Sequence, residues 1–256
     1  MGGGSLTTSA DPVSGATAVG AYRLLGGVGY QPASLTGNFA FANQVPSAVA
    51  PSSYNRSEVA TQTRVAYGQG MSEWCANCHP AMLQSGSTTG MGNFAGPQTG
   101  AHVVGNTSRM SQTVLGNYVA YIKSGSFSNT DATKAYLSLV PFEEGSSSYS
   151  TLKMHARVDD AYLNGPDTNS NVSCLTCHRA HASGFDASAR YRVSYDTVTM
   201  TVPDPNGTAM WPDPAINVAE AAGRSQAETQ QSYYGRAATT FAARQYDLCN
   251  KCHAKN

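Results

Sequence analysis

The sequence lacks several features that mark common functional classes. It has no run of about 18 apolar residues, so we expect no membrane-spanning helix. It has no net charge, with 16 Lys and Arg residues against 16 Asp and Glu residues, and this balance argues against nucleic-acid binding. Long regular elements are also scarce, because 25 glycines and 12 prolines interrupt the chain. We therefore expect a mostly irregular backbone with short α-helices and little β-structure.

Local patterns nevertheless predict a few short helices. Apolar residues at helical spacing favour a helix over residues 110–122. A second helix is expected to begin after Asp131 and to run towards Pro141, with Asp131 as its cap. A third pattern favours a short helix that begins near Asn55 and stops at Gly68.

A further helix is predicted to begin near Ser148 or Ser150. It would place Leu152 and His155 near one face and direct His155 inward. Residues 197–202 favour a strand, so a small hairpin or an isolated strand pair is expected before the turn-forming residues 203–207.

No cysteine lies outside one repeated motif, C-x-x-C-H. In this motif both thiols add to the vinyl groups of a porphyrin, and the histidine becomes the proximal iron ligand. Residues three and four apart share one face of a helical turn, so both sulfurs and the imidazole can meet one flat macrocycle. The sequence therefore predicts three covalently attached haem c groups. Their attachment and proximal residues are Cys75, Cys78 and His79; Cys174, Cys177 and His178; and Cys249, Cys252 and His253.

Two other uses of paired cysteines fit the pattern less well. A zinc site built from C-x-x-C pairs needs four ligands that converge on one metal, and it does not require a histidine after each second cysteine. A disulfide within C-x-x-C closes a small strained ring, so a disulfide framework is the weaker of the two alternatives.

The chain has three further histidines, His102, His155 and His181. Three haems need three distal ligands to become bis-histidine haems, so every histidine in the chain can be assigned to an iron. A lone histidine is more often a surface or hydrogen-bonded side chain, but the matching count favours the ligand assignment. A methionine remains open as the distal ligand of one haem.

The spacing of His178 and His181 limits how these ligands pair. Both project from about the same side of one turn, so they cannot bind opposite faces of one haem. We expect His181 to ligate a neighbouring haem, which would bring two haems close together. His102 or His155 must then complete the second haem, unless another subunit does so.

The haems are expected to supply the core that the polypeptide lacks, much as disulfides staple small domains. We predict an extended wrapping segment over residues 1–54 and a three-haem cytochrome domain over residues 55–256. Thioether attachment takes place beyond the cytoplasmic membrane, so the chain should be exported, to the cell surface or medium or alternatively to the periplasm. Residues 1–5 show no signal-peptide pattern, and we interpret them as a processed, trimmed or recombinant beginning.

The chain resembles the C-terminal half of the OmcS-type cytochromes, the filament-forming extracellular hexahaem cytochromes of metal-reducing bacteria. The matching stretches cover more than half of the chain and include Tyr67 to Trp74, which reads YGQGMSEW. They are residues 20–51, 61–79, 135–160, 174–186 and 248–255.

This resemblance implies bis-histidine haems stacked in a continuous line. It also implies copies of the chain joined end to end, with a distal histidine donated across the interface. The chain departs from the family in having three attachment motifs where the family has six. A fragment, a shortened relative and a partial chain all remain open as explanations.

The predicted function is electron transfer to redox partners or extracellular acceptors, because six-coordinate iron leaves no position for a substrate. The alternative is a multihaem reductase with one open haem site, although no C-x-x-C-K motif is present. A third reading gives the haems a purely structural role. Under the leading prediction the chain is an electron carrier and not an enzyme.

Overall fold

The computed structural model describes residues 6–7, 18–19, 26–30, 40–54, 57–83, 104–106, 108–121, 131–180, 183–193, 202–203, 209–210, 225–236 and 248–253. The chain divides into two compact units. The first comprises residues 1–46 and 70–102, and the second comprises residues 47–69 and 103–256. The wrapping segment and the three-haem domain that the sequence indicates, with their boundary at residue 54, stay a prediction.

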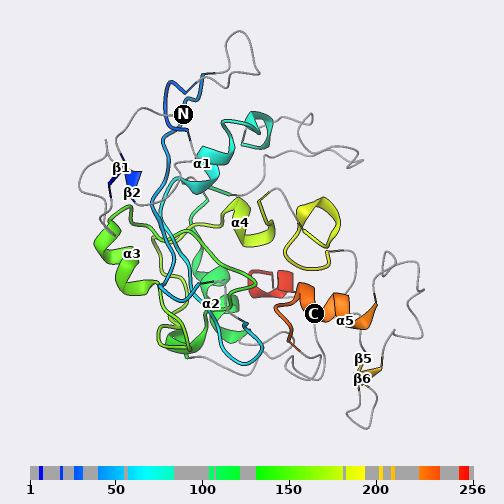
Figure 1. The fold of residues 1–256 in the computed structure, drawn as a ribbon. Coiled ribbons are helices and arrows are strands. Elements are labelled where there is room, and N and C mark those ends of the chain that lie inside the picture. The colour runs from blue at the N-terminus through cyan, green and yellow to red at the C-terminus, as the bar shows by residue number, and fades with distance from the viewer. Residues whose placement is uncertain are drawn as a thin grey trace. The chain divides into compact units, whose positions relative to one another are not determined.

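Helices in the described residues are short (Figure 1). The α-helices are α1 (Met71–Cys75), α2 (Gln112–Ala120), α3 (Tyr149–His155), α4 (Cys174–Cys177) and α5 (Gln226–Ser232). The 3-10 helices are η1 (Pro80–Met82), η2 (Ala132–Lys134), η3 (Asp186–Ser188) and η6 (Leu248–Lys251).

The described strands form three two-residue pairs, and isolated β-bridges such as that between Glu143 and Asn171 add to them. The strand β1 (Leu6–Thr7) pairs in parallel with β2 (Ala18–Val19). Two antiparallel pairs join β3 (Ala48–Val49) to β4 (Ala66–Tyr67) and β5 (Val202–Pro203) to β6 (Ala209–Met210). The expectation of a mostly irregular chain with short helices and little β-structure is therefore confirmed.

The main core of the second unit lies between α2 and the segment 135–142. Tyr118 of α2 is fully buried, and its hydroxyl donates to the carbonyl oxygen of Val140 at 2.6 Å. The Tyr118 and Phe142 rings pack in a T-shaped arrangement, with 5.6 Å between the ring centroids. Helix α2 also packs against η6, which carries the last attachment motif (Figure 1). The core is therefore built directly beside an attachment site.

A second apolar cluster joins α3 to the strand pair β3–β4. Leu152 is fully buried there among Val49, Ala66 and Ala156. Ser148 caps α3 by accepting a hydrogen bond from the Thr151 amide at 3.5 Å. The prediction of a helix that begins near Ser148 or Ser150 is confirmed. The helix predicted over residues 110–122 is also confirmed, within two residues at each end.

Two predicted helices are wrong. The Asp131 side chain does cap a helix, but that helix is the single 3-10 turn η2. Residues 135–140 are all buried, so no polar face remains to give a helical period. Residues 57–65 are also non-helical, because their polar groups bond to distant segments. Arg64, for example, donates its amide to the carbonyl of Arg157 at 2.8 Å.

A strand pair was expected before the turn-forming residues 203–207. The observed pair instead has β5 at the start of this segment and β6 after it. Residues 194–201, which carried most of that prediction, lie outside the described residues.

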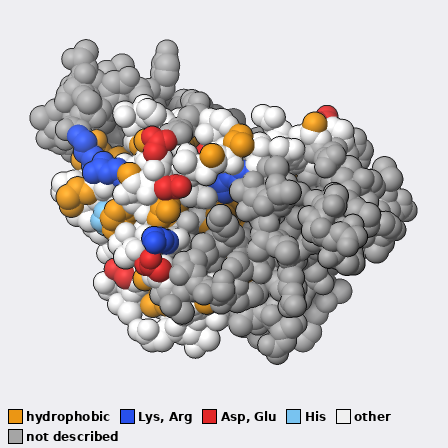
Figure 2. All heavy atoms as spheres, turned by 90° about the horizontal axis from the view of Figure 1, so that it is seen from below, with side chains coloured by type: hydrophobic (Ala, Val, Ile, Leu, Met, Phe, Trp, Pro, Cys, Tyr) orange, Lys and Arg blue, Asp and Glu red, His pale blue; other side chains and the backbone are white. Residues whose placement is uncertain are grey.

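No helix among the described residues combines the length and the apolar character needed to cross a bilayer. On the described part of the face in Figure 2, hydrophobic, basic and acidic side chains are interspersed. Met154, at 58% exposure, is among the exposed apolar side chains.

Candidate haem-attachment sites

The second C-x-x-C-H motif forms one helical turn, α4. Ser173 and Thr176 close this turn with a capping box, in which the Ser173 amide donates to the Thr176 hydroxyl at 3.0 Å. The His178 amide donates to the carbonyl oxygen of Cys174 at 2.9 Å. This bond closes a single helical turn that carries both thiols and leads into the imidazole, as the motif predicts.

The imidazole of His178 is fixed from behind by a loop. Its Nδ1 lies 2.8 Å from the carbonyl oxygen of Ala187, which can only accept, so Nδ1 carries the proton. This leaves Nε2 as the nitrogen with a lone pair for a metal. Ala187 and Ser188 both adopt φ of 53°, a left-handed conformation that is costly for residues other than glycine. The loop therefore holds the carbonyl in place at some cost in backbone energy.

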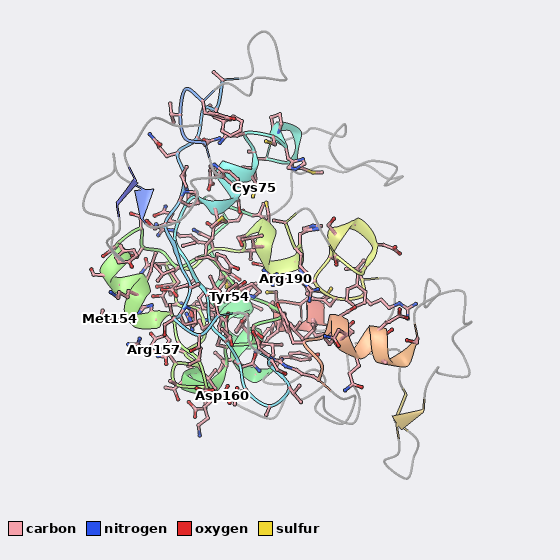
Figure 3. The ribbon with its side chains drawn as sticks, viewed as in Figure 1. Tyr54, Cys75, Met154, Arg157, Asp160 and Arg190 are labelled. Carbon is pink, nitrogen blue, oxygen red and sulfur yellow. The ribbon has the colours of Figure 1, made fainter. Side chains whose placement is uncertain are left out.

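Beneath the same turn, Arg190 is buried and bonds to the backbone of the motif. Its amide donates to the Cys177 carbonyl at 2.7 Å, and its Nε donates to the Leu175 carbonyl at 2.5 Å. Arg190 and Tyr54, both labelled in Figure 3, line a cavity of about 260 Å³. Within the described part of the chain, no carboxylate pairs with this guanidinium. Burial raises the pKa of Tyr67 in the cavity wall, so its hydroxyl stays protonated.

The first motif begins on α1 in the first unit. The His79 amide donates to the Cys75 carbonyl at 3.0 Å, which repeats the turn seen at α4. Asn77, inside the motif, binds the backbone of residues 42–43: its Oδ1 accepts from the Asn43 amide at 2.9 Å, and its Nδ2 donates to the Asn43 carbonyl at 3.0 Å. Trp74 Nε1 donates to the Gly26 carbonyl at 2.9 Å. Both side chains tie part of the predicted wrapping segment to the attachment turn.

The third motif follows the same geometry at the end of η6. The His253 amide donates to the Cys249 carbonyl at 2.9 Å. Lys251, inside the motif, is fully buried, and burial lowers the pKa of its ammonium group to about 7. The Asn117 side chain of α2 donates to the Cys252 carbonyl at 3.1 Å. Helix α2 thus holds the third turn from one side.

The second and third attachment turns contact the same core cluster. Cys252 packs against that cluster, and the Tyr191 hydroxyl from the cluster lies 3.5 Å from the Cys177 sulfur. Burial, with a smaller contribution from the neighbouring Cys177, raises the pKa of the Cys252 thiol to about 12. The second and third attachment turns are therefore joined through this one cluster.

Among the three histidines outside the motifs, the structure describes one. His155 ends α3, and its side chain is 25% exposed. Its Nδ1 contacts the Glu144 carboxylate, and its ring stacks on Tyr162 with 4.6 Å between centroids and 8° between planes. The sequence predicted that His155 points inward, and in the structure the residue is half-buried. His102 and His181 lie outside the described residues.

The residues present fit covalently attached haem. None of the six cysteines forms a disulfide, and Cys78, His79 and His253 are exposed. All three motifs share the bond from the histidine amide to the first cysteine carbonyl, at 2.9 to 3.0 Å. Thiols and imidazole on one turn form the donor set that attaches and ligates haem c.

Comparison with known proteins supports the same assignment, although no protein-family profile matches the chain. The chain is 53% identical over 99% of its length to the C-type cytochrome OmcS of Geobacter sulfurreducens. This chain resembles OmcS. It spans 55% of the OmcS sequence, so the half-length resemblance predicted from the sequence is confirmed.

Solved structures of OmcS have the same fold. The chain matches the cryo-EM structure of the OmcS nanowires from Geobacter sulfurreducens with a TM-score of 0.80 and 52% identity, covering 97% of this chain and 57% of that one. It matches the Outer Membrane Cytochrome S filament from the same organism with a TM-score of 0.78 and 52% identity, covering 98% and 58%.

Several residues that shape these sites were not predicted from the sequence. They are Asn77, Glu144, Ala187, Arg190 and Lys251. Asn77 and Lys251 occupy the variable positions of two motifs, which carry no signal for distant contacts. At Lys251 the only signal was its position between two cysteines that are expected to be buried against haem, where a charged side chain needs buried partners.

Proposed function

We propose that this chain carries electrons through three covalently attached haem c groups. The observation that carries the proposal is the shared geometry of the three motifs, in which each histidine amide bonds to the carbonyl of the first cysteine at 2.9 to 3.0 Å. When bound, each haem supplies an iron that changes its charge by one electron without binding a substrate.

Within this proposal, the chain's own residues hold and orient the haems. The six motif cysteines attach them, and His79, His178 and His253 are the proximal ligands. His102, His155 and His181 are the proposed distal ligands. At His178 the Ala187 carbonyl keeps the proton on Nδ1 and so presents Nε2 to the iron.

The second and third haems are proposed to lie close together. The support is that both attachment turns contact one core cluster, Cys252 directly and Cys177 through the Tyr191 hydroxyl at 3.5 Å. Close packing of two macrocycles would shorten the electron path and bury apolar porphyrin surface, at about 25 cal/mol per Å².

We further propose that copies of the chain assemble end to end and act outside the cell. The support is the likeness to OmcS, whose solved structures are named as nanowires and filaments. Redox proteins or extracellular acceptors would be the partners. Because the chain spans about half the length of OmcS, whether it assembles must be measured on the chain itself.

Spectroscopy and voltammetry of the purified holoprotein test this function. We expect a fully low-spin ferric spectrum and reversible one-electron waves on an electrode, without added substrate. A high-spin ferric signal in the folded protein would instead favour the multihaem reductase. Electron microscopy of the same sample distinguishes filaments from discrete particles.

A further inference from the structure

The Glu144 carboxylate contacts Nδ1 of His155 at the end of α3. Glu144 is 10% exposed at its side chain, so water competes little for its oxygens. An ionised carboxylate can only accept hydrogen bonds, so the proton between the two groups belongs to Nδ1 of the imidazole. Nε2 is thereby the basic nitrogen. Among the described residues, nothing bonds to Nε2.

Arg64 holds the same carboxylate from the other side. Its Nη2 lies 2.9 Å from Glu144 Oε1, and the Arg64 side chain is only 4% exposed. The guanidinium lies 4.5 Å above the Tyr136 ring and 4.9 Å from the Tyr162 ring. Its Nη1 also donates to the Asn164 carbonyl. With Arg64 fixed in this way, the Glu144 carboxylate has little freedom to turn away from His155.

The plane of the His155 ring is fixed as well. Tyr162 stacks on it almost in parallel, at 8° between planes and 4.6 Å between centroids. A ring held on one face and at Nδ1 can present Nε2 in only one direction. This is the arrangement of a preorganised metal ligand, in which an outer carboxylate sets both tautomer and orientation.

We propose that Glu144 is a positioning residue for His155 as a distal haem ligand. By accepting a hydrogen bond from Nδ1–H, Glu144 would direct Nε2 to the iron and make the imidazole a stronger donor, which favours the ferric over the ferrous haem. This proposal rests on the proposed function and names a determinant of one haem's potential. His178 differs, because its Nδ1 meets a neutral carbonyl, that of Ala187.

The direct test is a spectroelectrochemical titration of the E144Q holoprotein. Glutamine keeps the size of the side chain but removes the negative charge at Nδ1. Loss of an outer-shell partner of a metal ligand typically weakens binding 10- to 100-fold. If E144Q weakens the binding of His155 to ferric iron about tenfold more than its binding to ferrous iron, the potential of one haem rises by about 59 mV. The low-spin EPR signal of the same haem should change with it.

Glu58 provides a matched control. It is also buried and pairs with a buried arginine, Arg236, at 3.0 Å, with side-chain exposures of 9% and 3%. No histidine among the described residues contacts it. E58Q leaves an unpaired buried arginine, as E144Q does, but removes no partner from an imidazole. We expect E58Q to leave the EPR signal of every haem unchanged.

A double variant separates the histidine bond from the unpaired charge of Arg64. In R64M/E144Q both charges are gone. The potential of the affected haem should still be higher than in R64M alone, by the amount that corresponds to an about tenfold weaker preference for the ferric state. If the double variant and R64M have equal potentials, the Arg64 charge explains the shift and the proposal is wrong. Haem content and the visible spectrum verify that each variant folds.

His155→Ala distinguishes failure of this inference from failure of the proposed function. A high-spin signal in that variant, together with unchanged potentials in E144Q, would leave His155 as a ligand and overturn the role of Glu144. A fully low-spin His155→Ala variant would remove His155 from the ligand set and overturn the inference, while the three attached haems could still transfer electrons.

Discussion

Lys251 donates a hydrogen bond from Nζ to the carbonyl oxygen of Tyr118 at 2.8 Å, which joins the third attachment turn to α2. The same ammonium group donates to the Ala135 carbonyl at 2.6 Å and lies 4.1 Å from the centre of the Tyr118 ring. A fully buried lysine inside an attachment motif therefore links three segments of the core.

Replacing Lys251 with methionine should destabilise the holoprotein. The change leaves two buried carbonyl groups without their donor, at a cost of about 1–3 kcal/mol for each unsatisfied group. Thermal unfolding followed in the haem absorption band measures it. Lys134 is the control, because it is 70% exposed and its ion pair with Asp131 is 3.5 Å long. An equal loss in Lys251→Met and Lys134→Met would contradict a specific role for the buried contacts.

Asn77→Ala should loosen residues 42–43 from the first attachment turn. The change removes the hydrogen bonds to the Ala42 and Asn43 amides, at 3.0 and 2.9 Å. Hydrogen exchange at these two amides should speed up by about tenfold, which corresponds to about 1.4 kcal/mol. Asn77→Asp retains the accepting oxygen and should retain most of the protection. Haem attachment should not change, because the cysteines remain.

Gly145 and Gly116 should respond oppositely to alanine. A Cβ at Gly145 would lie 2.4 Å from the carbonyl oxygen of Asn169, whereas a Cβ at Gly116 on α2 meets nothing within 4 Å. Gly145→Ala forces a backbone shift and should cost about 1–3 kcal/mol. Gly116→Ala should stabilise α2 by up to about 1 kcal/mol. Chemical denaturation of both variants measures this difference in the free energy of unfolding. If Gly145→Ala leaves the stability unchanged, the backbone at Gly145 and Asn169 can move apart at little cost.

Ala187→Gly should stabilise the loop behind His178. Ala187 has φ of 53°, where glycine relieves about 1 kcal/mol of steric cost. Ala189, two residues on, has an ordinary φ of −66° and is buried, so Ala189→Gly should destabilise instead. Comparing the unfolding midpoints of the two variants decides the matter. If the unfolding midpoint falls in both variants, the left-handed conformation at Ala187 carries no net energetic cost.

The sequence predicted the features that depend on local patterns. Helix α2 followed from apolar spacing, helix α3 from apolar spacing after Ser148 or Ser150, and the attachment turns from a five-residue motif. These signals lie within one or two turns of the chain, where a helix periodicity or a cap can be recognised directly.

The remaining structure depends on contacts between distant residues. The segment 135–140 is buried throughout and carries no helical period, so its irregular path could not be predicted. The contact of Glu144 with His155 and that of Lys251 with Tyr118 leave no local mark in the sequence. Such contacts are set by how segments pack, and tertiary packing overrides local propensity.

The most direct measurement of the central claim is the intact mass of the denatured holoprotein. Thioether bonds survive denaturation, so covalently attached haem stays with the chain. The proposed function predicts a single species at the polypeptide mass plus three haems, and Cys174→Ala/Cys177→Ala should reduce this to two. A mature protein that carries fewer than three haems, or none, would contradict the proposal.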